Sequence, residues 1–269
     1  MTGPLISTAE LRDRLGEVTV LDVRYRTGGA AGQEEYVRGH VPGAVYVDLD
    51  TALADPPGAG GRHPLPEKGR FEEAMRRAGV SHGVPVVVYD DWQAMGAGRC
   101  WWLLRYHGHP DVRVLDGGWS AWVADGGAID LATPDPDPGD FVAEPGGMPV
   151  VEADDVLDVE VLVDARAPER YRGEVEPIDP VAGRIPGAVN VPTGRNLSED
   201  GRFRPAEELR EIYAAVGAVP GADVAAYCGS GVTAIHDVIA MEIAGVTAAL
   251  YPGSFSGWIA DPDRKVEVG

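Results

Sequence analysis

One short loop carries the residues best suited to covalent chemistry. Residues 228–234 read C-G-S-G-V-T-A, directly after the apolar run Val224–Tyr227 and directly before the helix-like stretch Ile235–Ile243. This order predicts a strand, a tight turn and a helix, with Cys228 at the helix N-terminus. There the helix dipole and inward-facing backbone N–H groups favour a thiolate over a thiol. A thiolate is a strong nucleophile, so we expect a catalytic cysteine rather than a buried structural one.

The chain has one other cysteine, Cys100. It lies in an apolar helical stretch, Gly98–Leu104, and we expect it to be a core residue that activity does not need. Two cysteines cannot form a disulfide framework, and free thiols suit a reducing compartment. The first ten residues lack the pattern of a secretory signal, and we therefore expect a cytoplasmic protein.

The charge balance limits the classes of partner. The 269 residues carry a formal net charge of −20, which repels nucleic-acid phosphates and anionic lipid surfaces. No apolar stretch approaches the roughly 18 residues that a membrane-spanning helix needs. We therefore expect no nucleic-acid or membrane partner, and an anionic substrate must meet a local positive group.

Four sequence blocks occur twice in the same order, which indicates two tandem homologous domains. The pairs are V-L-D-V-R at 20–24 with L-V-D-A-R at 162–166, G-H-V-P-G-A-V at 39–45 with G-R-I-P-G-A-V at 183–189, V-V-Y-D at 87–90 with A-A-Y-C at 225–228, and G-G-W-S at 117–120 with G-S-F-S at 253–256. The stretch between the copies is rich in Pro, Asp and Gly. We predict domains at 1–130 and 150–269, joined by a linker at 131–149.

Within each copy, short β-branched runs alternate with helical patterns. The predicted strands of the first copy are Thr19–Val23, Pro85–Tyr89 and Val112–Leu115, and Phe71–Ala78 is helical. This alternation predicts an α/β fold in which each domain is a parallel sheet flanked by helices. In such sheets, ligands bind beyond the carboxyl ends of the strands.

A helix is predicted at the start of each copy, and the signal is clearer in the first copy. Ser7 and Glu10 form a capping pair ahead of the first helix. The second copy matches this helix only loosely, at Glu152–Leu157.

The cysteine loop, the paired G-H-V-P-G-A and G-R-I-P-G-A blocks, and D-G-G-W-S-A-W at 116–122 together resemble the tandem rhodanese-type sulfurtransferases, across essentially the whole chain. The loop itself is most similar to that of the mercaptopyruvate sulfurtransferases. Thiosulfate-specific relatives usually carry basic residues where this chain has Gly229 and Ser230. The resemblance therefore implies a monoanionic donor, 3-mercaptopyruvate, and a persulfide carried on Cys228.

The resemblance also implies unequal roles for the two domains. The first domain of the family normally lacks the cysteine, and Asp90 stands at the matching position. An acceptor-only carboxylate cannot carry sulfur. We therefore expect a non-catalytic first domain and a catalytic second one.

Residue matching to the family places a proton relay on Ser230, His63 and Asp50. A serine hydroxyl polarised by histidine can take the thiol proton of the donor or protonate the leaving enolate, while the aspartate orients the ring. The alternatives are an ordinary loop histidine, a surface carboxylate and a turn serine.

A donor carboxylate needs a cation, and the planar fork of arginine matches it with two parallel hydrogen bonds. The family pattern puts this arginine at Arg170. Many mercaptopyruvate enzymes have a second arginine just downstream, but this chain reads E-P-I-D-P at 176–180, and Arg172 or Arg184 are the candidate substitutes. The loop residues Gly229, Gly231, Val232 and Thr233 are expected to bind the transferred sulfur through their N–H groups.

The resemblance thus implies a sulfurtransferase that needs no metal or organic cofactor and passes sulfur from a small anionic donor to cyanide, a small thiol or a thioredoxin-like protein. The first alternative is a thiosulfate:cyanide sulfurtransferase with the same nucleophile. A phosphatase needs an arginine in the loop after the cysteine, and residues 228–234 contain none. A silent binding module is disfavoured because such modules typically lose the cysteine.

Overall fold

The computed structural model describes residues 3–25 and 32–269. Their contacts divide the chain into two compact units. The first comprises Met1–Asp55, Pro66–Met148 and Asp200–Arg202, and the second comprises Pro56–Leu65, Pro149–Glu199 and Phe203–Gly269. Residues 56–65 lie in the first repeat by sequence but belong to the second unit.

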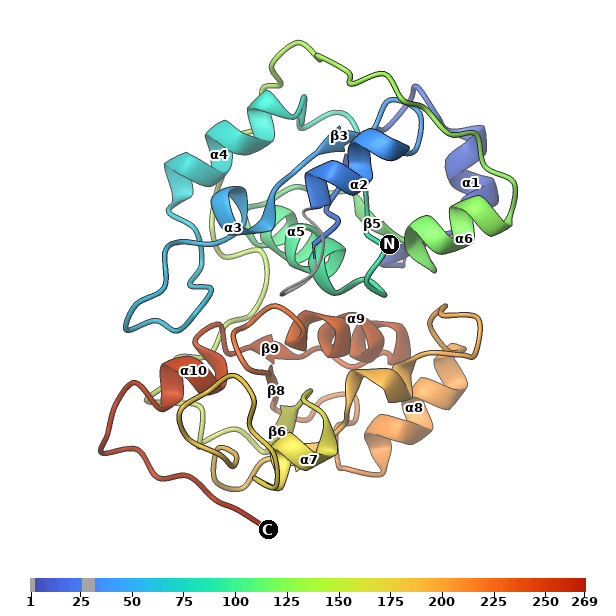
Figure 1. The fold of residues 1–269 in the computed structure, drawn as a ribbon. Coiled ribbons are helices and arrows are strands. Elements are labelled where there is room, and N and C mark those ends of the chain that lie inside the picture. The colour runs from blue at the N-terminus through green and yellow to red at the C-terminus, as the bar shows by residue number, and fades with distance from the viewer. Residues whose placement is uncertain (1–2, 26–31) are drawn as a thin grey trace. The chain divides into compact units, whose positions relative to one another are not determined.

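The first unit contains a five-stranded parallel sheet in the order β1-β5-β4-β2-β3, with helices packed around it (Figure 1). Its strands are β1 (Leu5–Ile6), β2 (Thr19–Asp22), β3 (Val45–Tyr46), β4 (Val86–Tyr89) and β5 (Val112–Leu115). Its helices are α1 (Thr8–Asp13), α2 (Gly32–Arg38), α3 (Leu49–Ala52), α4 (Lys68–Arg77), α5 (Met95–Tyr106) and α6 (Gly118–Ala124).

The second unit repeats this plan with a four-stranded parallel sheet in the order β7-β6-β8-β9. Its strands are β6 (Val161–Asp164), β7 (Val189–Asn190), β8 (Val224–Tyr227) and β9 (Ala249–Leu250). Its helices are α7 (Pro168–Tyr171), the 3-10 turn η1 (Thr193–Asn196), α8 (Ala206–Ala214), α9 (Ala234–Ala244) and α10 (Ser254–Trp258). A parallel bridge from Val150 to Leu250 stands beside β9, where the first sheet has a full strand.

The central strands are apolar because they are covered on both faces. Every residue of β4 and β8 is buried. Parallel strands covered by helices on both faces read as continuous apolar runs, which is the pattern of Val86–Tyr89 and Val224–Tyr227. The predicted α/β class, with two parallel sheets flanked by helices, is confirmed.

The predicted start of α1 is confirmed, whereas the helix predicted at the equivalent place in the second unit is wrong. Ser7 accepts from the N–H of Glu10, and the Glu10 carboxylate accepts from the N–H of Ser7, which completes a capping box. The stretch Glu152–Leu157 instead forms consecutive turns, in which the N–H of Asp155 donates to Glu152 O at 3.1 Å. It has no such capping pair, and within it only Val156 is buried.

The stretch expected to be a linker packs against the first unit over most of its length. Phe141 is fully buried and meets the ring of Phe71 edge-on. The N–H groups of Gly139 and Glu144 donate to Arg76 O and His107 O. Residues up to Met148 belong to the first unit, and the second resumes at Pro149.

The middle of α5, which carries one cysteine and two tryptophans, belongs to the hydrophobic core. Cys100, Trp101 and Trp102 are all fully buried. Burial raises the pKa of the Cys100 thiol well above its usual range, which keeps it protonated. Within residues 3–25 and 32–269, no helix is long and apolar enough to cross a membrane.

Candidate active site

The cysteine loop follows β8 and leads directly into α9, as the sequence predicts. Cys228 is 1% exposed, and residues 229–232 are also buried. Gly231 has φ +76, a left-handed conformation that glycine adopts without strain. A Cβ at this position would lie 2.3 Å from Pro252 O, so only glycine fits the turn.

The sulfur of Cys228 lies among backbone and hydroxyl groups. The N–H of Gly231 donates to Cys228 Sγ at 3.2 Å, and Ser254 Oγ lies 4.0 Å from the same atom. In the described part of the chain, no acceptor pairs with the N–H groups of Gly229, Val232 and Thr233. The loop can therefore offer several donors to a negatively charged sulfur.

Ser254, at the start of α10, is hydrogen-bonded to the backbone of the cysteine loop. Its Oγ accepts from the N–H of Cys228 at 3.1 Å and donates to Tyr251 O at 3.0 Å. Its φ of +51 is unusual for a residue with a side chain, and such strain is retained where the surrounding structure demands it. The N–H groups of Phe255 and Ser256 donate to Cys228 O and Gly229 O, both at 2.9 Å.

His63 contacts the hydroxyl of Ser230. His63 Nδ1 lies 2.8 Å from Ser230 Oγ, a hydrogen-bond distance in which either atom can donate. The preceding residues anchor this histidine within the second unit. Gly61 has φ +100, and the N–H of Arg62 donates to Ser256 Oγ at 3.1 Å.

Asp50, the third predicted member of the relay, belongs to the first unit. It lies in α3, whose first turn Asp48 caps, and it is exposed. Ser230 and His63 are thus in contact within one unit, while the pairing of Asp50 with His63 stays a prediction.

Arg170, on α7, approaches the cysteine loop together with a second arginine, Arg62. A Cβ built on Gly229 would lie 2.6 Å from Arg62 Nη2 and 3.6 Å from both Nη atoms of Arg170. Burial lowers the pKa of Arg62, and the negative charge that Cys228 would carry opposes this effect. An arginine pKa starts so high that the guanidinium stays charged at neutral pH.

Two buried carboxylates hold these arginines. Glu176 accepts from Arg170 Nη2 at 2.7 Å and from Arg170 Nε at 3.1 Å. Asp179 accepts from Arg170 Nη2 at 3.1 Å and also pairs with Arg62 Nη1. The segment that lacks the expected second arginine therefore supplies two anions.

Neither candidate substitute arginine from the sequence joins the site. Arg172 forms an exposed ion pair with Glu174 at 2.8 Å. Arg184 donates to Gly269 O at 2.6 Å and lies over the ring of Tyr171. Both guanidinium groups are engaged at the periphery of the second unit.

The matching loop in the first unit contains Asp90 and is closed by its own side chain. The Asp90 carboxylate accepts from the N–H groups of Trp92, Ala94 and Ala97 at 2.9–3.0 Å. Burial raises its pKa to about 6, and these hydrogen bonds oppose the rise.

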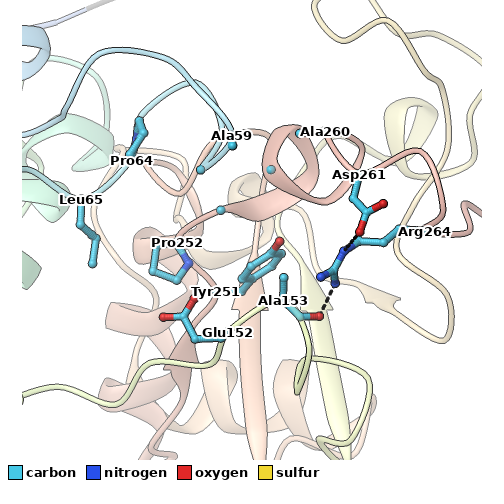
Figure 2. A pocket seen from close by; sticks show the side chains of 13 residues that line it. Ala59, Pro64, Leu65, Glu152, Ala153, Tyr251, Pro252, Ala260, Asp261 and Arg264 are labelled. Atoms are coloured by element: carbon cyan, nitrogen blue, oxygen red, sulfur yellow. Dashed lines mark hydrogen bonds and ion pairs between the residues drawn. The ribbon is translucent and has the colours of Figure 1, made fainter.

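A pocket of the second unit lies beside the segment that carries His63 (Figure 2). Its lining residues are Ala59, Gly60, Pro64, Leu65, Glu152, Ala153, Tyr251, Pro252, Gly253, Gly257, Ala260, Asp261 and Arg264. Arg264 donates to Ala153 O and pairs with Asp261, as the dashed lines show. Cys228 does not line this pocket, so we place the sulfur chemistry at the loop and not there.

Sequence reasoning missed Arg62, Ser254, Glu176 and Asp179 as members of the site. Arg62 had a usable signal, because it directly precedes His63 in the chain. Glu176 and Asp179 stood out only as departures from a family pattern. Ser254 aligns with Gly118 of the first copy, and its left-handed φ is visible only in three dimensions.

Comparisons with known proteins agree on one family. The model of the Rhodanese-like domain matches residues 7–125 and 151–261. A putative thiosulfate sulfurtransferase of Mycobacterium tuberculosis is 44% identical over 98% of this chain and 97% of its own, and a probable 3-mercaptopyruvate sulfurtransferase of Pseudomonas aeruginosa is 41% identical over 98% of each. The solved 3-mercaptopyruvate sulfurtransferase of Leishmania major superposes with a TM-score of 0.86 at 31% identity, covering 94% of this chain and 73% of that one. The chain belongs to the rhodanese family of sulfurtransferases, with two tandem copies of its domain.

Proposed function

We propose that the protein transfers sulfur from 3-mercaptopyruvate to a thiol or cyanide acceptor through a persulfide on Cys228. The observation that carries the choice of donor is the 2.8 Å contact between His63 and Ser230, two residues from the nucleophile. A relay that moves protons suits a donor thiol, which must lose a proton as its sulfur is transferred. Thiosulfate has no such proton to lose.

In the first half-reaction, the Cys228 thiolate attacks the donor sulfur and forms an S–S bond. The donor C–S bond breaks, its electron pair stays on carbon, and pyruvate leaves as an enolate. The donor thiol proton passes to the relay of Ser230 and His63 and returns to the enolate carbon. The products are pyruvate and a persulfide anion on Cys228, so atoms and charges balance.

The persulfide is held until an acceptor arrives. The outer, negatively charged sulfur would accept hydrogen bonds from backbone N–H groups of the loop. The candidate donors are the N–H groups of Gly229, Gly231, Val232 and Thr233. An acceptor thiolate or cyanide then attacks this sulfur and releases the Cys228 thiolate. We propose Asp50 as the group that orients His63, and Arg170 as the cation that binds the donor carboxylate.

We also propose a class of acceptor and a compartment. A persulfide reacts with small thiols and with thioredoxin-like proteins that present an exposed thiolate. Cys100 and Cys228 are both free, which supports a reducing, cytoplasmic location. The net charge of −20 disfavours nucleic acid or anionic lipid as partners.

A second candidate is transfer from thiosulfate to cyanide with the same nucleophile. The relative from Mycobacterium tuberculosis, named as a putative thiosulfate sulfurtransferase, favours this candidate. So does the absence of an arginine in residues 176–180.

The test compares both donors on one purified sample. Pyruvate release from 3-mercaptopyruvate and thiocyanate formation from thiosulfate are measured side by side with cyanide as the acceptor. We expect a higher kcat/KM for 3-mercaptopyruvate. A higher kcat/KM for thiosulfate would overturn the proposed donor and leave the Cys228 persulfide in place.

A further inference from the structure

Two guanidinium groups from separate segments converge beside the nucleophile. Arg62 comes from the loop that carries His63, and Arg170 comes from α7. Both lie over Gly229, with Arg62 Nη2 at 2.6 Å and Arg170 at 3.6 Å from the place of its missing Cβ. Gly229 is the residue after Cys228, so both cations are close enough to bind the anionic part of a sulfur donor.

The two cations are balanced by two buried carboxylates. Glu176 pairs with Arg170, and Asp179 pairs with both Arg170 and Arg62. The carboxylate side chains are only 4% and 3% exposed, so water screens their charge weakly. Two positive and two negative groups leave this cluster with no net charge.

A neighbouring ion pair does not change this balance. Arg166 is paired with Asp164 at 2.6 Å, and both side chains are buried. Its remaining contact with the cluster is a 3.7 Å approach to Glu176. The charge that an incoming donor meets is therefore set by Arg62, Arg170, Glu176 and Asp179, together with the Cys228 thiolate that attacks it.

We propose that Arg62 is the second donor-binding cation of this enzyme and that Asp179 makes the site select singly charged over doubly charged sulfur donors. The inference rests on the proposed function. Asp179 holds the Arg62 guanidinium beside the loop, where the remaining N–H groups of Arg62 can donate to a donor carboxylate. A monoanion brings one negative charge to a neutral, part-buried cluster, whereas a dianion brings two, and uncompensated charge in such a site is unfavourable.

Removing the Arg62 charge tests the first part. We expect Arg62→Gln to raise the KM for 3-mercaptopyruvate about 10- to 100-fold, the loss of one hydrogen-bonded ion pair, with a much smaller change in kcat. Arg62→Lys keeps the charge without the planar fork, so its KM should fall between those of the other two forms. The matched control is Arg172→Gln, which removes an exposed arginine paired with Glu174.

Removing the Asp179 charge tests the second part. Asp179→Asn gives the cluster one net positive charge, and we expect the ratio of kcat/KM for thiosulfate to that for 3-mercaptopyruvate to rise by about tenfold. Glu174→Gln makes the same change of net charge at an exposed site and should leave the ratio unchanged. The double variant Arg62→Gln/Asp179→Asn restores neutrality and should return the ratio towards that of the unmodified enzyme.

The outcomes separate this inference from the donor assignment. An Arg62→Gln variant with the KM of Arg172→Gln, or an Asp179→Asn variant with the ratio of Glu174→Gln, would overturn the inference. If the unmodified enzyme releases no pyruvate, the donor assignment fails, but a lower thiosulfate KM in Asp179→Asn than in Glu174→Gln still supports the role of Asp179. Thermal unfolding midpoints identify misfolded variants, and the neutral double variant then carries the test.

Discussion

The loops after β4 and β8 occupy equivalent positions in the two sheets. They differ in the side chain at their centre, which is a carboxylate in the first loop and a thiol in the second. In the first, the Asp90 carboxylate accepts from two N–H groups of its own turn and from one in the first turn of α5. In the second, Cys228 Sγ accepts from the N–H of Gly231, and other N–H groups of the turn remain open to a ligand. A carboxylate closes this kind of turn from within, whereas a thiolate leaves it ready to receive a second sulfur.

Both loops depend on residues with a left-handed backbone conformation. Gln93 and Gly231 occupy equivalent positions and both have positive φ, at +55 and +76. Gly118 and Ser254 are likewise equivalent, with φ +58 and +51. Among the described residues, the first copy has two residues with side chains at positive φ, Gln93 and Ala94 at φ +63, and the second copy has one, Ser254. The Ser254 hydroxyl lies 4.0 Å from Cys228 Sγ.

The largest expected difference between the loops lies in proton transfer. Ser230 contacts His63 at 2.8 Å, whereas Trp92 stands at the equivalent position of the first loop. We expect His63→Gln to lower kcat with 3-mercaptopyruvate by roughly 100- to 10,000-fold, the usual contribution of a general acid–base group. Steady-state pyruvate release measures it, with His82→Gln in the first unit as the control. A kcat within a factor of two of the unmodified enzyme would remove His63 from the relay.

Removing the carboxylate from the first loop should lower the stability of the protein and leave its sulfur-transfer activity unchanged. Asp90→Ala leaves three N–H groups without an acceptor, and each of the two buried ones, at Ala94 and Ala97, costs about 1–3 kcal/mol. We expect the free energy of unfolding to fall by several kcal/mol in urea titrations. Unchanged stability would show that the loop rearranges easily and that the carboxylate does not close it.

The charge on Asp90 gives the stability of the protein a pH dependence. Burial raises the pKa of Asp90 from 3.8 to about 6, so its ionised form is disfavoured in the folded state. Relative to Asp90→Asn, the unmodified protein should therefore lose about 3 kcal/mol of stability as pH rises from about 4 to above 6. Unfolding free energies of both forms at pH 4, 5, 6 and 7 measure the difference. A difference that stays constant with pH would contradict the raised pKa.

Local signals were strong enough to predict the fold and the strand–turn–helix that carries Cys228. The repeated blocks, the apolar run Val224–Tyr227 and the glycines after Cys228 predict the sheet, the turn and the helix that the structure contains. The failed helix at Glu152–Leu157 had neither a cap nor an apolar face, so tandem symmetry alone was a poor guide there.

The charged part of the site could not be predicted because its partners are far apart in the chain. Arg62 and Asp179 are separated by 117 positions, and no local pattern relates them. The sequence offered Arg172 and Arg184 only as substitutes for the arginine missing from 176–180, and both pair with peripheral groups. Only packing reveals that the loop before His63 supplies the second cation.

The most direct test of the account asks which atom carries the sulfur. The protein is incubated with 3-mercaptopyruvate without acceptor, freed of excess donor, and analysed by intact-mass and peptide mass spectrometry without reductant. We predict one added sulfur atom on the peptide that contains Cys228, lost on addition of cyanide, present in Cys100→Ser and absent in Cys228→Ser. Added sulfur in Cys228→Ser, or on the Cys100 peptide of the unmodified protein, would contradict the account.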